Sequence, residues 1–580
     1  MNSKNSNQYC ESYNAYQPWS TREILIGNLK LGGSNPIRLQ SMSSCKPLDT
    51  EANVEQAIRI IDAGGELVRF TAPIVKDAEN LGNISQQLRQ KGYNQPLVAD
   101  IHFNPKAALS AADFVEKVRI NPGNFAETSK SKINYTNQEY QDALDAIEIK
   151  FVELLNKCKT NKVAIRIGSN HGSLSQRVMD RYGDTPEGMV EAAMEYLRLA
   201  VKHKFYDLVL SMKASNIRVM VQAYRLLAAR MRIEKMNFPL HLGVTEAGEG
   251  EDGRIKSAAG IGALLEDGLG DTIRVSLTED PEFEIPVAKV IADRYQKRTR
   301  EDFTQLNRTK ITELPYNPFE FLQRKTKVVA GIGGKNEMPV IGYDWKPIDE
   351  YIDGFKNLII PIEKWKKSIN NAKPLMSLAQ YIDLTEKPES SFVKVNYQDF
   401  YLDKIQQLNG GESIILVFEE EGDYCVHTFR SMFIALINLN LQFPVILKRS
   451  YSNLSELDLQ IYAAIDFGAL LVDGLGDGIW LQSDIKIPQT RINEISLGIL
   501  QASRSRISKT DFISCPSCGR TLFNIQEATA QIREKTAHLK GLKIAIMGCI
   551  VNGPGEMADA DYGYVGALPE RINLYKGKEV

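Results

Sequence analysis

Short β-branched apolar runs alternate with longer stretches of helical periodicity through the first three hundred residues. One helical stretch, residues 187–202, follows Thr185 as a candidate N-cap and Pro186 at the first helical position. Alternation of this kind predicts parallel strands joined by helices. Eight runs are predicted strands: Ile37–Ser41, Leu67–Phe70, Leu97–Ile101, Lys117–Ile120, Val163–Ile167, Leu208–Met212, Leu240–Val244 and Thr272–Ser276. Eight strand–helix units predict that residues 20–300 form an α/β domain, a (β/α)8 TIM barrel.

The predicted strands end in polar residues, at the end of a TIM barrel where the chemistry normally takes place. Five cations that converge on one barrel mouth repel one another unless an anion joins them. The pattern therefore predicts a ligand with several negative charges, most simply a diphosphate or two phosphates. The candidate binding residues are Arg69, Asp100, His102, Arg119, Asn121, Arg166, Asn170, Lys213, Ser215, Arg274 and Ser276. Among them stands Glu246, which either neutralises the cations or acts as an acid or base.

The barrel pattern is partly repeated in the middle of the chain. The segment Gly262–Ile273 returns as Gly468–Ile479 with ten of twelve positions identical, which indicates an internal duplication. A Phe-Pro pair precedes each copy, and a Gly-Gly pair is a weaker candidate for the beginning of each. These pairs are Phe238-Pro239 and Phe443-Pro444, then Gly32-Gly33 and Gly333-Gly334.

The second copy lacks the polar groups of the first. Trp480 and Gln482 replace Arg274 and Ser276, and Tyr451 or Ser452 stands where the first copy has Glu246. We therefore expect residues 305–490 to form a degenerate barrel-like domain with a structural role.

The last ninety residues predict a small α+β domain, residues 495–580, that carries a cluster of cysteines. Cys515 and Cys518 lie three positions apart in a loop, and Cys549 follows a predicted strand. This is a chelating arrangement, for which zinc and an iron–sulfur cluster are the candidates. The elements around it are a helix from about Ile525 to His538 and a strand, Leu542–Met547.

The number of ligands bears on the choice of metal. A zinc ribbon needs a second cysteine pair, whereas only Cys549 is available and His538 on a helix is a poor fourth ligand. Three thiolates suit a [4Fe–4S] cluster in which one iron takes another ligand, and the nearest hard ligand is Glu556. A carboxylate on iron is more readily displaced than a thiolate. Iron–sulfur is thus favoured, with zinc as the alternative.

Composition narrows the class of protein. With 70 basic and 72 acidic side chains the net charge is −2, which provides no overall field for binding nucleic acid. Hydrophobic residues make up 43% and charged residues 24%, as in a soluble globular protein. No apolar run is long enough to span a membrane, and the polar N-terminus predicts no targeting segment. We expect a cytoplasmic protein, and seven unevenly spaced cysteines argue against a disulfide framework.

Several motifs resemble those of the 4-hydroxy-3-methylbut-2-enyl diphosphate synthase family. The resemblance runs through the whole first barrel and the whole C-terminal domain, and the long middle segment resembles the three-domain form of the family. The motifs are TREILIGNLKLGG, PIRLQSM, ADIHFN, RINPGN, RIGSNHGSL, SMKAS, HLGVTEAGEGEDGRIKSAAGIGALLEDGLGDTIRVSL, CPSCGRTLFN and MGCIVNGPGE.

The resemblance implies an activity, a cofactor and partners. The substrate would be 2-C-methyl-D-erythritol 2,4-cyclodiphosphate, which is reductively dehydroxylated with ring opening in the methylerythritol phosphate route to isoprenoids. A [4Fe–4S] cluster would be held by Cys515, Cys518, Cys549 and Glu556, with Glu246 and Glu556 in catalytic roles. Ferredoxin or flavodoxin would supply the electrons. The C-terminal domain would close over the barrel, within one chain or across a homodimer.

Two other readings stay open at this stage. A pterin-dependent TIM-barrel transferase with a zinc module would also gather Arg, Asp and Asn at its strand ends. A non-enzymatic zinc-ribbon binding protein built on duplicated barrels is the other. Both predict a colourless protein that contains zinc.

Overall fold

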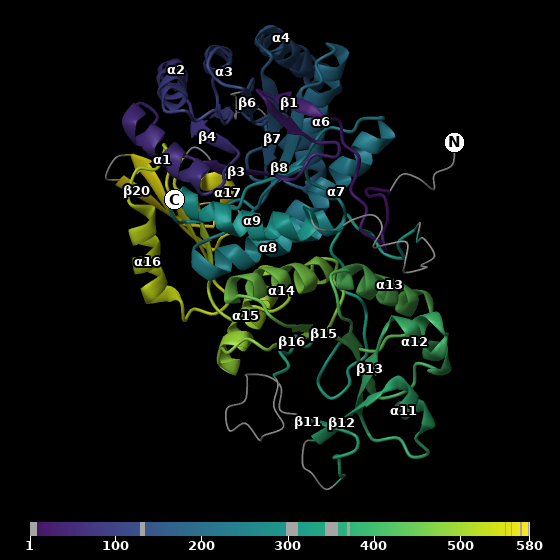
Figure 1. The fold of residues 1–580 in the computed structure, drawn as a ribbon. Coiled ribbons are helices and arrows are strands. Elements are labelled where there is room, and N and C mark those ends of the chain that lie inside the picture. The colour runs from purple at the N-terminus through teal and green to yellow at the C-terminus, as the bar shows by residue number, and fades with distance from the viewer. Residues whose placement is uncertain are drawn as a thin grey trace. The chain divides into compact units, whose positions relative to one another are not determined.

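The computed structural model describes most of the chain, and the chain divides into two compact units. The described residues are 8–127, 134–296, 298, 311, 313–342, 358–367, 372–550, 553–557, 559–568, 571–577 and 579–580. The first unit comprises Met1–Cys10, Pro18–Thr299 and Lys509–Val580. The second comprises Glu11–Gln17 and Arg300–Ser508. Figure 1 shows the helices and strands of both.

The first unit contains an eight-stranded parallel sheet in the order β8-β7-β6-β5-β4-β3-β10-β9. A parallel bridge between Leu210 and Leu240 brings the two ends of this sheet together, so the barrel is nearly closed. The eight predicted strands and the barrel are confirmed. The strands are β3 (Arg38–Met42), β4 (Leu67–Thr71), β5 (Leu97–Asp100), β6 (Lys117–Ile120), β7 (Ala164–Asn170), β8 (Leu208–Lys213), β9 (His241–Leu242) and β10 (Thr272–Ile273).

Helices follow the strands and lie outside them (Figure 1). Helix α6 begins as the sequence predicts, because the Thr185 side chain accepts a hydrogen bond from the Gly188 amide and Pro186 occupies the first turn. The helices are α1 (Thr50–Asp62), α2 (Val75–Gln90), α3 (Pro105–Ala111), α4 (Asn137–Asn161), α5 (Gln176–Tyr182), α6 (Pro186–Lys202), α7 (Ile217–Ile233), α8 (Gly250–Glu266), the short η2 (Pro281–Phe283) and α9 (Glu284–Gln296).

A small hairpin closes the end of the barrel at which the strands begin. It consists of β1 (Ile24–Ile26) and β2 (Leu29–Leu31), which pair antiparallel. Its apolar side chains pack in a buried cluster against residues near the starts of four barrel strands: Leu67, Val98, Ala164 and Val209. A ligand must therefore enter from the other end, where the strand-end cations lie.

The C-terminal part of the first unit is a four-stranded sheet in the order β17-β18-β19-β20, in which the first three strands are parallel and β20 is antiparallel. The predicted strand and helix are confirmed, whereas the hairpin of β19 and β20 was not predicted. The elements are β17 (Asp511–Ser514), α16 (Ile525–Thr536), β18 (Lys543–Met547), the short α17 (Gly553–Glu556), β19 (Tyr562–Leu568) and β20 (Arg571–Lys576).

The second unit is built on a six-stranded parallel sheet whose strands follow chain order. This open half-barrel confirms the second, degenerate barrel-like fold. Its strands are β11 (Leu358–Pro361), β12 (Ala372–Ser377), β13 (Ser391–Val395), β14 (Ile414–Glu419), β15 (Val445–Tyr451) and β16 (Gly478–Ser483). Its helices are α11 (Leu378–Asp383), α12 (Tyr397–Tyr401), η3 (Lys404–Gln407), α13 (Cys425–Asn438), α14 (Glu456–Leu471) and α15 (Gln489–Ala502).

The repeated segment makes the same hydrogen bonds in both units. Asp271, just before β10, accepts from the Thr21 hydroxyl at 2.6 Å and from the Leu240 amide at 2.7 Å. Asp477, just before β16, accepts from the Thr326 hydroxyl at 2.8 Å and from the first amide of β15 at 2.9 Å. The two copies thus share the frame that ties the last strand to its neighbour and to the N-terminal segment, as a duplication predicts.

The Gly-Gly pairs occupy matching places in this frame. The Gly33 amide donates to the Thr21 hydroxyl at 3.2 Å, and the Gly334 amide donates to the Thr326 hydroxyl at 2.8 Å. All four glycines of the two pairs have positive φ, a backbone conformation that other residues rarely adopt. The two Gly-Gly pairs therefore occupy corresponding places near the beginning of each copy, although their sequence match is weak.

No helix in the described part of the chain is both long and apolar enough to cross a membrane.

Candidate active site

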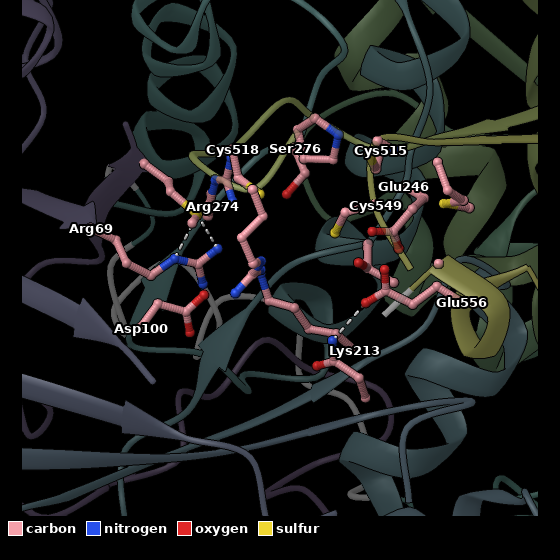
Figure 2. A pocket seen from close by; sticks show the side chains of 18 of the residues that line it. Arg69, Asp100, Lys213, Glu246, Arg274, Ser276, Cys515, Cys518, Cys549 and Glu556 are labelled. Atoms are coloured by element: carbon pink, nitrogen blue, oxygen red, sulfur yellow. Dashed lines mark hydrogen bonds between the residues drawn. The ribbon is translucent and has the colours of Figure 1, made fainter. Parts of the chain in front are cut away.

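The first unit contains a cavity between the mouth of the barrel and the C-terminal sheet of the same chain. Figure 2 shows Cys515, Cys549, Glu246 and Glu556 on one side of it and Arg69 on the other. The barrel lines it with Met42, Arg69, Asp100, Arg119, Arg166, Asn170, Ser211, Lys213, Thr245, Glu246, Arg274 and Ser276. The C-terminal sheet and its loops add Cys515, Pro516, Cys518, Arg520, Met547, Gly548, Cys549, Gly553 and Glu556.

Every candidate residue from the sequence lines this cavity except His102, Asn121 and Ser215. His102 lies behind Arg119, with its Nε2 2.9 Å from Arg119 Nη1. The Asn121 amide nitrogen donates to the Ser173 hydroxyl at 3.0 Å, which shapes the loop after β6. Ser215 is buried directly after β8. These three residues support the lining instead of forming it.

Three of the five cations have no carboxylate partner among the residues that the structure describes. Burial and the neighbouring Arg69 and Arg166 lower the pKa of Lys213 well below its usual range. Arg166 is buried, and its Nε and Nη1 have no hydrogen-bond partner among the described residues. Arg69 donates from Nε and Nη2 to the Met42 sulfur at 2.9 and 2.7 Å, and a thioether is a weak acceptor. Donors left in this state favour a bound anion.

The same crowding acts on Arg69 itself. Burial, opposed by Asp100 and reinforced by Arg274 and Arg119, lowers the pKa of Arg69 to about 10. The cations therefore raise one another's electrostatic free energy, and an anionic ligand would relieve this repulsion.

The other two cations are held by carboxylates and so are fixed in place. Arg119 donates to Asp100 Oδ1 at 2.9 Å and to the Gly168 carbonyl at 2.9 Å. Arg274 donates to both carboxylate oxygens of Glu284, at 3.0 and 2.9 Å. A bidentate pair of this kind sets the orientation of the guanidinium plane. Glu284 lies at the start of α9, away from any strand end, so the strand-end pattern did not predict it.

His102 is neutral in this setting. Burial, together with the positive charge of Arg520, lowers the pKa of His102 to about 3. Because an arginine can only donate, Nε2 of the ring accepts from Arg119. His102 thus orients a cation of the cavity.

Glu246 has a strained backbone and a buried carboxyl. Its φ is +47°, in the left-handed region, which costs about 1–3 kcal/mol for such a residue. Burial and the neighbouring carboxyl of Glu556 raise the pKa of Glu246 well above its usual range. Its Oε2 has no hydrogen-bond partner among the described residues. Strain of this kind is concentrated at functional sites.

The three cysteines come from the loops that follow β17 and β18. Cys515 directly follows β17, and the Gly548 amide donates to its sulfur at 3.2 Å. Burial and the nearby thiol of Cys518 raise the pKa of Cys515 well above its usual range. Among the described residues, no three His, Cys, Asp or Glu side chains converge as ligands of one metal ion.

Glu556 connects the two walls of the cavity. It is buried at the end of α17, and its Oε1 accepts a hydrogen bond from the Asn170 amide at 2.9 Å. Asn170 is the last residue of β7, so the barrel directly contacts the loop that carries Cys549 and Glu556. The two walls therefore meet within one chain.

Arg520 is a sixth cation of the cavity, and it was not predicted. It comes from the loop after Cys518, opposite the barrel cations. Although burial opposes its charge, Cys518 and Asp100 raise the pKa of Arg520 above its usual value. The sequence did contain one indication of this position: in the motif CPSCGR, Arg520 stands two positions after Cys518.

Comparison with known protein families identifies both parts of the first unit. Residues 21–289 match the family model described as the GcpE TIM-barrel domain. Residues 511–580 match the model described as the GcpE protein C-terminal domain.

Curated relatives are similar over nearly the whole chain and are named 4-hydroxy-3-methylbut-2-en-1-yl diphosphate synthase (flavodoxin). The relative from Phocaeicola vulgatus is 48% identical, covering 97% of this chain and 95% of its own. The relative from Bacteroides fragilis strain ATCC 25285 is 49% identical, covering 97% and 93%. The relative from Leptospira interrogans is 42% identical, covering 99% and 95%. The pterin-dependent alternative finds no support in these names. The chain belongs to the 4-hydroxy-3-methylbut-2-en-1-yl diphosphate synthase family.

Proposed function

We propose that the chain converts 2-C-methyl-D-erythritol 2,4-cyclodiphosphate to 4-hydroxy-3-methylbut-2-enyl diphosphate and water, in the methylerythritol phosphate route to isoprenoids. One observation carries the proposal: barrel cations that have no carboxylate partner in the described part of the chain face three cysteines and Glu556 across one cavity. The cations suit a diphosphate, and the cysteines suit a group that carries electrons. A reductive step on a diphosphate substrate uses both.

The residues on the second wall fit a [4Fe–4S] cluster held by Cys515, Cys518, Cys549 and Glu556. Each ligand of such a cluster binds a different iron, so the ligands surround a volume instead of converging on one point. A single zinc ion would need four ligand atoms within about 2.3 Å of it. Three thiolates and one carboxylate line this wall, which suits the cluster better than a zinc ribbon, since a zinc ribbon needs a second cysteine pair. When bound, the cluster would supply electrons one at a time and an iron with Lewis-acid character.

The reaction balances with two electrons and one proton. The bond from C2 to the phosphate oxygen and the C3–hydroxyl bond break, and a C2–C3 double bond forms. The phosphate oxygen stays on the product, and the hydroxyl leaves as water with the added proton. Arg69, Arg166 and Lys213 would bind the diphosphate, and Arg119 and Arg274 would fix its orientation.

We assign the proton to Glu246. Its carboxyl lies in the cavity beside Glu556, and its Oε2 makes no hydrogen bond to the described residues. Glu556, held by Asn170, would position the loop that carries Cys549 against the substrate. A general acid in this position would act only once the C-terminal sheet covers the barrel mouth.

The three parts of the chain take different roles in this proposal. Residues 20–300 bind the substrate, residues 495–580 hold the cluster, and residues 305–490 are structural. Flavodoxin is the electron donor, since the relatives carry it in their names.

Purification without oxygen tests the proposal. The expected product is a brown protein with about four iron and four sulfide per chain. This preparation should turn over the cyclic diphosphate with reduced flavodoxin or with a reduced viologen dye. Stoichiometric zinc without sulfide would overturn the proposal.

A further inference from the structure

We propose that Arg520 is a catalytic residue, which binds the phosphate oxygen that leaves C2 when the cyclic diphosphate opens. The inference rests on the proposed function and adds to it a group that stabilises charge formed during the reaction. Of the described residues that line the cavity, Arg520 is the only cation from the C-terminal sheet and its loops. The other cations of the lining come from the barrel.

The guanidinium of Arg520 lacks acceptors. Its Nε and Nη1 are buried and have no hydrogen-bond partner among the described residues. Two carboxylates of the same cavity are engaged with other groups. Asp100 accepts from Arg119 at 2.9 Å, and Glu556 accepts from Asn170 at 2.9 Å. Buried donors in this state favour a ligand whose oxygen atoms accept from them.

A tight turn fixes the place of Arg520 in the loop. The Cys518 amide donates to the Thr521 hydroxyl at 3.0 Å, and the Thr521 amide donates to the Cys518 carbonyl at 2.8 Å. Arg520 lies between these two residues, inside the turn. Its backbone is therefore held at a set position relative to the cysteine that precedes it.

The same turn packs directly on the barrel. A β-carbon added to Gly519 would lie 2.5 Å from the Cys45 carbonyl and 2.6 Å from the Thr71 hydroxyl. Thr71 ends β4, two positions after Arg69, so the two side chains point to the same face of the strand. Burial lowers the pKa of Arg69 to about 10, and the charge of Arg520 adds to this shift. Arg520 and Arg69 thus approach the same part of the cavity from opposite walls.

Ring opening increases the negative charge of the diphosphate. The electron pair of the C2–oxygen bond stays on the phosphate oxygen, and the pair of the C3–hydroxyl bond leaves with the hydroxyl, which the added proton converts to water. The two added electrons form the second bond between C2 and C3. The released oxygen belongs to a terminal phosphate, whose second pKa is about 6, so at neutral pH this phosphate carries more charge than it did in the ring.

Arg520 suits the stabilisation of this new charge. A guanidinium donates to two phosphate oxygens at once through its planar fork. Donors that are already in place where charge develops lower the barrier of the step that forms it. The unpaired barrel cations would hold the charge that the substrate brings, and Arg520 would hold the oxygen that the reaction releases.

The first test is Arg520→Met, purified without oxygen together with its cluster. We expect kcat for the cyclic diphosphate to fall about a hundredfold with little change in KM. Affinity of the oxidised holoenzyme for 4-hydroxy-3-methylbut-2-enyl diphosphate, measured by calorimetry, should fall about tenfold. Affinity for the cyclic diphosphate should fall less, because the ring lacks the released oxygen. Iron and sulfide content should match the wild type.

Two further variants sharpen the test. Arg520→Lys keeps the charge but not the fork, so its kcat and its affinity for the product should lie between those of Arg520→Met and the wild type. Arg571 is exposed at the start of β20 in the same domain, and Arg571→Met makes the same chemical change away from the cavity. Arg571→Met should leave kcat and both affinities unchanged.

Two results would overturn the assignment. One is wild-type affinity for the product in both Arg520 variants. The other is loss of iron and sulfide in Arg520→Met with product affinity retained, which would make Arg520 a support of the cluster. Failure of the proposed function has a different signature, since the wild-type protein would then neither bind the product nor turn over the cyclic diphosphate.

Discussion

The barrel and the half-barrel share a frame but differ in how they treat charge at the strand ends. In the barrel, Arg166 and Lys213 line the cavity, and neither forms an ion pair with a carboxylate of the described residues. In the half-barrel, Lys448 at β15 forms an ion pair with Glu419 at the end of β14, and Lys394 lies 3.5 Å from the same carboxylate. A lysine that is paired with a carboxylate does not need a bound anion to offset its charge. The two copies therefore differ in a few strand-end side chains, which in the barrel have no carboxylate partner among the described residues.

The half-barrel also places a buried aromatic residue where the barrel has a cation of the cavity. Trp480, at the position that corresponds to Arg274, is 5% exposed and belongs to a buried cluster with Phe392, Ile415 and Ile446. Its ring lies 4.9 Å from the ammonium of Lys448. A site arginine has thus been replaced by a core aromatic residue, which suits the structural role proposed for this part of the chain.

The largest effect should come from Arg166→Met. Loss of two charge-assisted hydrogen bonds of roughly 2 kcal/mol each should lower kcat/KM for the cyclic diphosphate about a thousandfold. The free energy of unfolding should stay the same or rise, because the variant removes a buried cation whose Nε and Nη1 make no hydrogen bond to the described residues. Steady-state kinetics and denaturant unfolding measure the two quantities.

Lys448→Met is the matched change in the half-barrel. It leaves Glu419 with one ion pair fewer and should lower the free energy of unfolding by about 1 kcal/mol. Substrate kinetics should not change. An effect of Lys448→Met on KM would break the comparison, since the half-barrel would then take part in substrate binding.

The next largest effect should come from Glu246→Gln. The amide keeps the size of the side chain but cannot donate the proton of an acid, so kcat should fall about a hundredfold while KM changes little. Tyr451 stands at the corresponding place in the half-barrel, with its hydroxyl 2.8 Å from Asp466. Tyr451→Phe should leave kcat and KM as they are. Equal kcat for Glu246→Gln and the wild type would show that Glu246 serves only to balance charge.

Sequence patterns predicted the frame and most of the cavity because both depend on local signals. The strands are short β-branched runs, and the polar residues near their ends, such as Arg166 and Lys213, can be identified directly in the sequence. Residues that act from outside a strand end escaped prediction. Glu284 reaches Arg274 from a helix, and Arg520 enters from the opposite wall. Tertiary packing alone brings such residues to the site.

The contact between the two walls of the cavity could not be predicted from the sequence either, although both of the segments that form it belong to motifs identified there. A β-carbon added to Gly172 would lie 1.9 Å from the Gly555 carbonyl, and one added to Gly555 would lie 2.0 Å from the Gly172 carbonyl. Both glycines belong to quoted motifs, NHGSL and NGPGE. Only the fold shows that the two backbones touch beside Asn170 and Glu556.

Gly172→Ala tests how the closing of the C-terminal sheet over the barrel contributes to catalysis, independently of the residues that bind substrate or transfer the proton. The added methyl group cannot fit against Gly555, so the C-terminal sheet should cover the barrel less completely, and kcat should fall about tenfold with the iron content unchanged. Small-angle scattering with the cyclic diphosphate bound should give a larger radius of gyration than for the wild type.

The half-barrel offers a control with the same backbone conformation. Gly331 has a φ of +82°, against +76° for Gly172, and a β-carbon there would meet nothing within 4 Å. Gly331→Ala therefore introduces the same backbone strain without a clash. If Gly331→Ala lowered kcat as much as Gly172→Ala, strain and not closure would explain the loss.

The smallest effect should come from Trp480→Phe. The smaller ring leaves part of the buried cluster around Ile415 and Ile446 unfilled, which should cost about 1–2 kcal/mol and lower Tm by a few degrees. Because Trp480 belongs to the core of the half-barrel, kcat and KM for the cyclic diphosphate should match the wild type. Calorimetry and steady-state kinetics on one preparation give both values. A change in KM without a change in Tm would assign Trp480 to the site and end the distinction between a binding barrel and a structural copy.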